Sequence, residues 1–181
     1  MADQALKSMT VDEFMVWDDG TDTRYELDAG RVRPVANQSN AHGTIKASLG
    51  GLIGISLRGR SPIHGEMSSV IRISHDTMWM ADVTVNPQIA TAEIGEPILI
   101  VEVLAATSRT HDLGRKLPDY VALPYVREIW MVDAERRWVQ AWMRKGDAAF
   151  AVVTIAGNTV LESPLLNSMI ELDEIYACTG L

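Results

Sequence analysis

Glu102 is the one charged residue in an otherwise apolar run that spans residues 98–104. A continuous stretch rich in β-branched residues predicts a strand that is buried on both faces of an α/β sheet. An unpaired carboxylate in such a strand is energetically costly, so a chain keeps it only with a partner. We therefore expect Glu102 to face a metal ion, to face a lysine or arginine, or to carry a proton.

Asp82 provides a second carboxylate in another strand-like segment. Strand alternation predicts that Val83 and Val85 face one side of the sheet while Asp82 faces the other. Asp82 precedes Glu102 by 20 residues, which suits two neighbouring strands joined by a polar connection. Adjacent carboxylates repel each other unless a cation lies between them. Mg²⁺, or Mn²⁺ in its place, accepts such oxygen ligands, and the main-chain carbonyl of Val103 can supply a third.

A helix is predicted to follow the Glu102 strand directly, so Lys116 can point back over the end of that strand. Asp112 precedes Lys116 by four residues and Tyr120 follows it by four, which places the three side chains on one helical face. Lys116 is therefore the candidate cation for the carboxylates. The alternative is that Asp112 and Lys116 form a surface pair, which contributes about a few tenths of a kcal/mol.

The elements that must position these residues follow from capping, turn and periodicity signals. Alternating helical and strand patterns predict one mixed sheet flanked by helices. Three helices are expected to begin at Thr10, at Ser39 or Asn40, and at Thr107 or Ser108, and a short one at residues 172–176. The expected strands are residues 24–27, 31–34, 63–66, 70–74, 79–85, 98–104, 126–132, 138–143 and 150–155.

The composition limits the class of protein. Of 181 residues, 47% are hydrophobic and 22% charged, so we expect a single domain over residues 1–181. No apolar stretch is long enough for a membrane span and the first residues do not read as a signal peptide, so no membrane contact and a cytoplasmic location are expected. The single cysteine excludes an internal disulfide. A net charge of −8 argues against a surface coated for nucleic-acid binding, although it allows a local basic patch.

Several of these residues occur together in an order that resembles a known family. The chain resembles the Uma-type restriction endonuclease family, a bacterial branch of the PD-(D/E)XK nuclease superfamily, over residues 11–142. No single motif is specific, but the order and spacing of the set are. The motifs are Tyr25-Glu26-Leu27, His42, Asp82, Val101-Glu102-Val103-Leu104, Asp112, Lys116-x-x-x-Tyr120 and Arg127-Glu128-Ile129-Trp130-Met131-Val132-Asp133.

The resemblance implies a restriction-endonuclease-like α/β fold, with a central mixed β-sheet flanked by helices and a metal site at one sheet edge. It implies that Asp82 and Glu102 bind Mg²⁺, that Lys116 orients the attacking water or offsets charge in the transition state, and that Glu26 is an accessory acid. The implied reaction is hydrolysis of DNA phosphodiester bonds, in which a metal activates water and shields the phosphate charge. Members of the superfamily often dimerise, so a homodimer is expected.

The chain departs from the pattern of that superfamily at several positions. The superfamily lysine usually follows the second acidic residue by two positions, where this chain has Leu104, so Lys116 on the next helix would take its place. Ala81 stands where the family has proline, and two alanines at 105–106 replace a Ser-Pro pair. Pro118 is expected either to kink the Lys116 helix or to lie in its first turn.

Two other functions stay open on the sequence. A catalytically idle module for oligomerisation or partner binding is favoured by the acidic charge balance and by the alanines at 105–106, whereas the retained acidic residues and lysine oppose it. A phosphodiesterase acting on a smaller phosphate ester would not need a basic surface. His42 is interpreted as a cap or packing residue in preference to a substrate contact.

Overall fold

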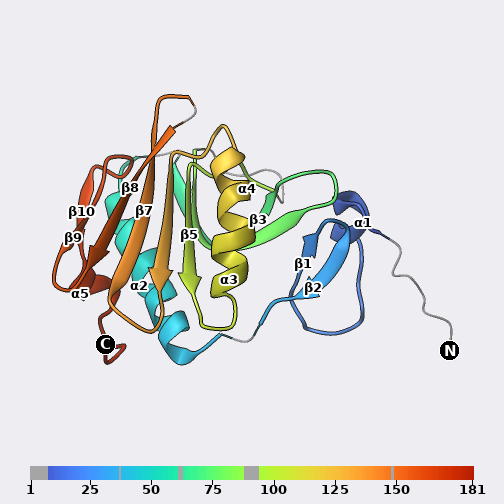
Figure 1. Cartoon of the computed structure of the whole chain (residues 1–181), viewed down its shortest axis with the longest axis horizontal. Helices are drawn as coiled ribbons and strands as arrows, with labels where there is room; N and C mark the ends of the chain where they lie inside the picture. The colour runs from blue at the N-terminus through green and yellow to red at the C-terminus, as the bar shows by residue number, and fades with distance from the viewer. Residues whose placement is uncertain (1–7, 37, 61–62, 88–93, 148) are drawn as a thin grey trace.

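The structure is a computed structural model and describes residues 8–36, 38–60, 63–87, 94–147 and 149–181. Its centre is a sheet of eight strands in the order β2-β1-β4-β5-β6-β7-β8, with β3 also paired to β4 (Figure 1). β5 and β6 run parallel and the other pairs run antiparallel, so the sheet is mixed, as predicted. The strands are β1 (Tyr25–Asp28), β2 (Arg31–Pro34), β3 (His64–Arg72), β4 (Met78–Asn86), β5 (Leu99–Leu104), β6 (Glu128–Asp133), β7 (Trp138–Lys145) and β8 (Ala149–Ala156).

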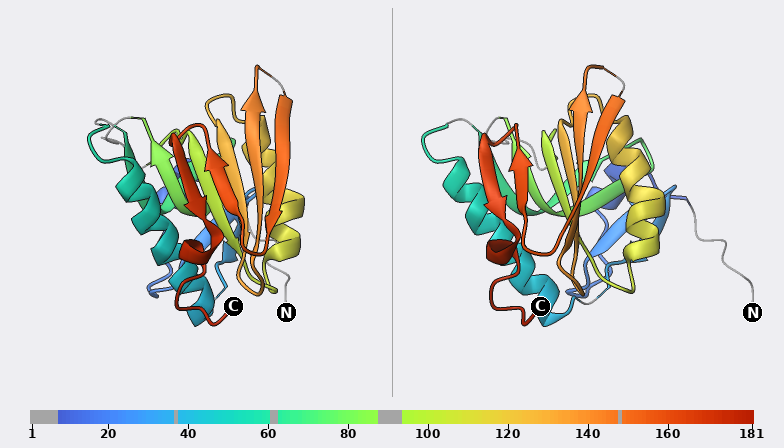
Figure 2. Two further views of the ribbon diagram at one scale, coloured as in Figure 1. Left: turned by 90° about the vertical axis from the view of Figure 1, so that its left-hand side faces the viewer. Right: turned by 60° about the vertical axis from the view of Figure 1, so that its left-hand side comes forward.

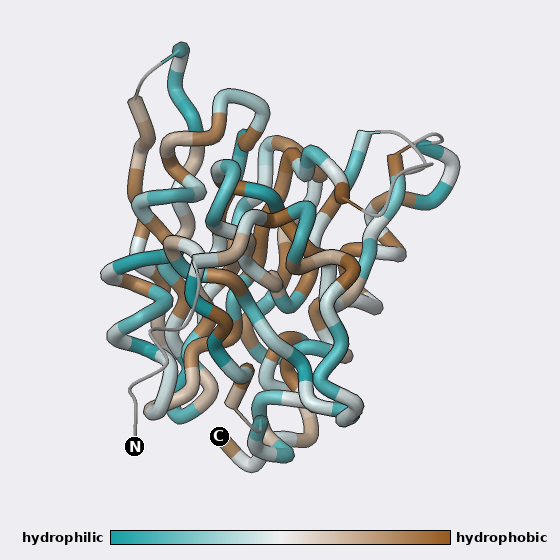
Figure 3. Tube along the Cα trace, turned by 90° about the vertical axis from the view of Figure 1, so that its right-hand side faces the viewer, coloured by the Kyte–Doolittle hydropathy of each residue, from teal (hydrophilic) through white to brown (hydrophobic). Residues whose placement is uncertain are grey.

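Helices cover both faces of this sheet (Figure 2). On one face, α2 (Asn40–Ser56) packs with a small hairpin, β9 (Val160–Ser163) and β10 (Ser168–Glu171), and with α5 (Leu172–Ile175). On the other face lies a helical segment of three parts, α3 (Arg109–His111), the π-helical turn η1 (Asp112–Lys116) and α4 (Leu117–Ala122). Each face buries its own hydrophobic core, and the apolar strands between them form the brown interior of Figure 3. The prediction of a sheet between helices is confirmed.

Local sequence signals explain where the first elements begin. Thr10 and Glu13 form the predicted capping box of α1 (Val11–Met15). Ala29 and Gly30 both adopt positive φ, 47° and 77°, as the two central residues of a type I′ hairpin turn require. Ser39 caps α2 by accepting a hydrogen bond from a main-chain N–H in its first turn, which the sequence also predicts.

The helical segment that carries Lys116 contains a π turn immediately before Pro118. Proline lacks an N–H, and its ring clashes with the carbonyl four residues earlier in an α-helix. Here the N–H of Leu117 bonds to the carbonyl of Asp112, and Pro118 lies in the first turn of α4, one of the two expected positions. The prediction that a side chain caps this segment is wrong, because Ser108 occupies the N-cap position without a side-chain cap hydrogen bond.

β3 is one continuous strand that includes most of the two segments predicted at 63–66 and 70–74, so two strands, β3 and β4, occupy the region where the sequence predicts two or three. The ladder between β3 and β4 is interrupted opposite Asp82, where Ser68 has a φ of 59°. The alternation of β4 reverses at the same point: Trp79 belongs to the core under α4, whereas Val83 belongs to the core under α2. Asp82 therefore lies at the point where the alternation of side chains along β4 changes from one face of the sheet to the other.

The C-terminal part contains the elements that the sequence reading missed. The sequence analysis predicts no element for the β9–β10 hairpin, whereas the short helix α5 after it is where the sequence predicts one. This hairpin covers the α2 face with Leu161 and Ile170. None of the helices in the described part of the chain is long and apolar enough to span a membrane.

Candidate active site

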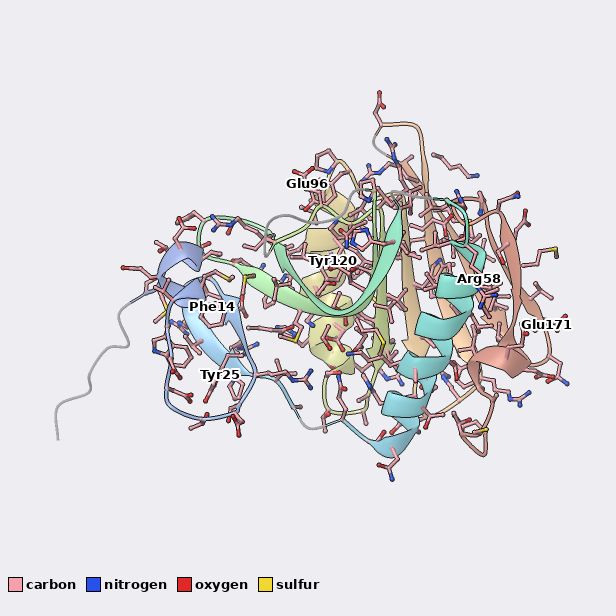
Figure 4. All side chains as sticks on the ribbon, turned by 180° about the vertical axis from the view of Figure 1, so that it is seen from behind. Phe14, Tyr25, Arg58, Glu96, Tyr120 and Glu171 are labelled. Atoms are coloured by element: carbon pink, nitrogen blue, oxygen red, sulfur yellow. The ribbon has the colours of Figure 1, made fainter. Side chains whose placement is uncertain are left out.

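A cavity of about 390 Å³ is lined by residues of the β1–β2 hairpin, the first half of α2, the middle of β4 and β5, and the α3–η1 segment. Figure 4 shows the crowded interior beside it, with Tyr120 labelled on α4 and Tyr25 on β1. The residues that the sequence singles out as chemical candidates border this cavity, although they come from four different elements. They are Glu26, Asp82, Glu102, Val103 and Lys116.

Glu102 lies in β5 with 3% of its surface exposed. Its Oε1 accepts a hydrogen bond from the Tyr120 hydroxyl at 2.6 Å and another from Lys116 Nζ at 3.2 Å. Lys116 is the last residue of η1, and its Nζ contacts the sheet at the main-chain carbonyl of Met80 in β4. The structure thus gives the buried carboxylate a lysine partner and a phenol partner.

Lys116 is shared among three carboxylates. Its Nζ lies 2.7 Å from Glu26 Oε1, 3.2 Å from Glu102 Oε1 and 3.7 Å from Asp112 Oδ1. It also donates to the main-chain carbonyl of Met80 at 3.1 Å. Asp112 and Lys116, four residues apart, therefore form a buried pair. The alternative of a surface pair is wrong, since both side chains are at most 7% exposed.

These contacts give the Glu102 cluster an unusual protonation pattern. Burial raises the pKa of Glu102 to about 8. The positive charge of Lys116 lowers this pKa, but burial and the negative charges of Asp82 and Asp112 outweigh it. Burial also opposes the charge of Lys116, but the surrounding carboxylates raise its pKa above the usual value. Burial and the neighbouring carboxylates raise the pKa of Tyr120 as well. At neutral pH the cluster therefore holds a charged lysine and a protonated Glu102.

Asp82 has a different set of neighbours. Its Oδ1 accepts hydrogen bonds from Gln38 Nε2 at 3.1 Å and from Lys46 Nζ at 3.2 Å. Its Oδ2 accepts one from the main-chain N–H of Val103 at 2.9 Å and lies 3.2 Å from His42 Nε2. Burial acts to raise the pKa of Asp82, but His42, the Val103 N–H and Lys46 together lower it to about 2. Asp82 is therefore ionised at neutral pH.

The oxygen atoms around Asp82 and Glu102 determine whether a divalent cation fits in the cavity. Within the described residues, no group of three or more His, Cys, Asp or Glu side chains is arranged to hold a metal. Mg²⁺ needs fewer protein ligands, because it keeps several waters and uses one or two carboxylates. Asp82, Glu102 and the carbonyl of Val103 are donors of that type. They fit Mg²⁺ provided that one of the four donors around Asp82 gives up its place, since a carboxylate offers about four lone-pair positions.

Comparisons with known proteins concern the family and the fold of the chain. The model of the Uma2 family, described as "Putative restriction endonuclease", matches residues 11–174. The chain belongs to this family. An uncharacterized protein of Synechocystis sp. (strain ATCC 27184 / PCC 6803 / Kazusa) is 21% identical over 173 residues, which cover 93% of this chain and 91% of that protein. The crystal structure of a putative nuclease belonging to DUF820 from Anabaena variabilis ATCC 29413 is 12% identical, with a TM-score of 0.77 over 93% of this chain and 98% of the other.

This member of the Uma2 family places further residues in the cavity that the sequence interpretation passed over. His42 is a partner of Asp82 and its packing role is secondary, while its main chain, not its side chain, takes part in the cap. The sequence favours a solvated basic face for Lys46, together with Arg58 and Arg60, which is wrong because Lys46 is buried, and it gives Gln38 no role. The available signal was that Lys46 follows His42 by four residues on a helical face that is otherwise apolar, at Ile45 and Leu49.

The basic residues of this Uma2 protein are distributed unevenly around the cavity. Arg24 and Arg33, both exposed, lie on its lining. By contrast, Arg60 and Arg144 donate to main-chain carbonyls elsewhere and so serve the fold. Arg58 lies beyond the C-terminal end of α2 (Figure 4), far along the helix from Lys46. Arg24 and Arg33 are thus exposed arginines that line the cavity, whereas Arg58, also exposed, lies away from it.

Proposed function

We propose that this protein hydrolyses phosphodiester bonds of DNA in the cavity, with Mg²⁺ or Mn²⁺ as cofactor. The observation that carries the proposal is that Asp82, Glu102 and Lys116 converge from β4, β5 and η1 on one cavity, where Lys116 Nζ lies 3.2 Å from Glu102 Oε1. Membership of a restriction-endonuclease family supports the reaction class. A fold alone does not fix a function, so the side chains of this cavity decide which reaction the protein can carry out.

Each residue has a proposed task. Asp82, Glu102 and the Val103 carbonyl would hold the cation, which supplies water activation and charge shielding when bound. Lys116 stays protonated and can offset the negative charge that grows on the phosphate oxygens. Glu26 accepts hydrogen bonds from Lys116 and from the Met80 N–H, at 2.7 and 2.9 Å, and so holds the ammonium group over the sheet.

Arg24 and Arg33 are the proposed contacts for the phosphate backbone. Both are exposed on the cavity lining, where a phosphate bound near Lys116 would have its neighbouring phosphates within a positive field. Binding through so few cations predicts modest affinity that weakens as salt rises. This agrees with a chain whose net charge is −8.

A cleavage assay tests the proposal. Plasmid, linear duplex and single-stranded DNA are incubated with MgCl₂ or MnCl₂, and wild type is compared with Asp82→Asn and Glu102→Gln. Glu162→Gln, on the exposed side of β9, is the matched control. We expect both site variants to lose activity about a hundredfold or more and the control to match wild type.

The other outcomes of the assay distinguish the alternatives. Cleavage that survives both substitutions contradicts the site. Absence of both cleavage and calorimetric metal binding favours the idle module, for which the full set of donors on Asp82 is the supporting observation. Hydrolysis of a small phosphodiester without cleavage of DNA favours the phosphate-ester enzyme.

The homodimer is also a proposal. β8 ends the order of the large sheet, and Val152 and Val153 on it are 44% and 45% exposed, which is compatible with a second copy pairing there. Sedimentation velocity on wild type and on Val153→Lys measures it. A monomer at all concentrations contradicts the dimer without affecting the site.

A further inference from the structure

Lys46 is a buried cation on the α2 side of the cavity. It is 7% exposed, and the other buried residues of α2 are Ile45, Leu49, Ile53 and His42. A charged group that lies so deep in a helix–sheet interface needs a partner, because its desolvation is costly. Its Nζ has two, Asp82 Oδ1 at 3.2 Å and Ser68 Oγ at 2.7 Å.

The Lys46 ammonium occupies a position on Asp82 that a metal would need. The two oxygens of Asp82 have four neighbouring donors, which saturates the lone pairs of a carboxylate. The Val103 N–H belongs to the backbone of β5 and cannot leave. Lys46, by contrast, carries its charge on a flexible four-carbon stem and can move it without moving α2.

Ser68 provides a place for the displaced ammonium group. Its hydroxyl is already in contact with Nζ, so the lysine can give up Asp82 and keep a hydrogen-bond acceptor. Ser68 has a φ of 59° at the gap in the β3–β4 ladder opposite Asp82. A non-glycine residue in this conformation is strained, and such strain occurs where the local geometry serves a purpose.

We propose that Lys46 is a built-in counter-ion of Asp82 that a divalent cation must displace, and that Ser68 retains the displaced ammonium group. Lys46 thereby sets the affinity of the site for the metal, and its contact with Asp82 joins α2 to β4 when no metal is bound. The inference rests on the proposed function in one respect, namely that Asp82 is a metal ligand. It does not depend on which substrate is cleaved.

Calorimetric titration with MnCl₂ tests the proposal without an activity measurement. Wild type, Lys46→Met and Lys46→Arg are compared at one pH and ionic strength, with Lys145→Met as a control that removes the same charge from an exposed site. We expect Lys46→Met to bind Mn²⁺ about tenfold more tightly than both wild type and the control. Lys46→Arg keeps the competing charge, so its affinity should not exceed that of wild type.

Each outcome of the titration has a distinct meaning. Equal or weaker binding by Lys46→Met, while wild type binds Mn²⁺, overturns the counter-ion role and leaves the proposed function intact. No binding by either protein overturns the metal site and with it both proposals. Tighter binding that Asp82→Ala does not abolish in the Lys46→Met background overturns the assignment to Asp82.

A wild-type crystal soaked with MnCl₂ gives a second measurement, which holds even if Lys46→Met fails to fold. The anomalous signal locates the metal, and the position of Nζ is then compared with the contacts described above. We expect metal on Asp82 with Nζ on Ser68 alone. Metal on Asp82 with the Lys46 contact unbroken overturns the proposal.

Discussion

Asp82 and Glu102 lie on adjacent antiparallel strands and border one cavity, yet their neighbours move their pKa values in opposite directions. Burial by itself raises the pKa of both carboxylates. Asp82 nevertheless stays ionised, with a pKa lowered to about 2, whereas the pKa of Glu102 is raised to about 8. The difference lies in how many donors each carboxylate has for itself.

Asp82 has donors of its own, two of them from α2, whereas several acids share the one cation that η1 provides. Four donors surround Asp82, and none of them comes from the cluster of Lys116. Lys116 is divided among Glu26, Glu102 and Asp112. Pairs of acids whose environments separate their pKa values are a common property of catalytic sites, where one is needed charged and the other can take a proton.

The largest change in the free energy of unfolding is expected when the lysine next to each carboxylate is replaced. Lys116→Met leaves three buried carboxylates without their shared cation, so we expect a loss of about 3 to 5 kcal/mol in the free energy of unfolding at pH 7. Lys46→Met leaves three donors on Asp82, so its loss should be about 1 kcal/mol. Urea denaturation measures both, with Lys145→Met as the control. Equal losses would show that the surroundings of the two carboxylates do not differ in the way described.

A smaller effect is expected from Glu102→Gln, and it should depend on pH. In the folded state Glu102 keeps its proton up to a pKa of about 8, whereas the ordinary value is 4.5. The folded state therefore binds more protons between these values, and stability falls as pH rises through that window. The variant lacks this loss, so we expect it to exceed wild type by a few kcal/mol at pH 9 and to match it near pH 4.

Thermal unfolding at both pH values, with and without MgCl₂, measures this effect. Wild type should rise in melting temperature with Mg²⁺ and the variant should not, because it has lost a ligand. A lower melting temperature for Glu102→Gln at pH 9 would mean that Lys116 anchors an ionised Glu102, which contradicts the raised pKa.

The smallest effect concerns Asp82 at acidic pH. Its pKa is lowered from 3.8 to about 2, so its contribution to stability is present above the ordinary value and is lost as pH falls through about 2. We expect wild type to lose about 1 kcal/mol more than Asp82→Asn between about pH 4 and pH 2. Parallel pH profiles for the two proteins, measured by urea denaturation, would contradict the lowered pKa.

Much of this arrangement follows from local signals in the sequence. The capping residues at Thr10 and Ser39, the turn at Ala29-Gly30 and the apolar run around Glu102 each specify an element by short-range chemistry. The mixed sheet follows from the order of those elements. The convergence of Asp82 and Glu102 was predictable for the same reason, since their strands are neighbours in sequence.

The remainder depends on contacts between distant segments. Gln38 lines the cavity, and Ser68 meets Lys46 at the interrupted ladder of β3 and β4. No local pattern records either contact, because each joins segments that are far apart in the sequence. Lys46 could have been suspected from its spacing to His42, but periodicity alone does not say which strand residue it meets. The β9–β10 hairpin was missed because its four-residue strands are joined by residues 164–167, which lack the short glycine-containing turn that identifies the equally short β1–β2 hairpin.

The π turn before Pro118 also fixes the number of residues that can separate the Glu102 strand from Lys116. A π turn holds one more residue than the α-helical turn it replaces. Deleting Gly114, which has open space around it, would let this turn become regular α-helix and would shorten the separation of Asp112 and Lys116 from four residues to three. Residues three apart on an α-helix are still neighbours, but Lys116 would approach Asp112 from the other side of that face, so we expect the contacts of Lys116 to tolerate substitution at Gly114 better than a change in length.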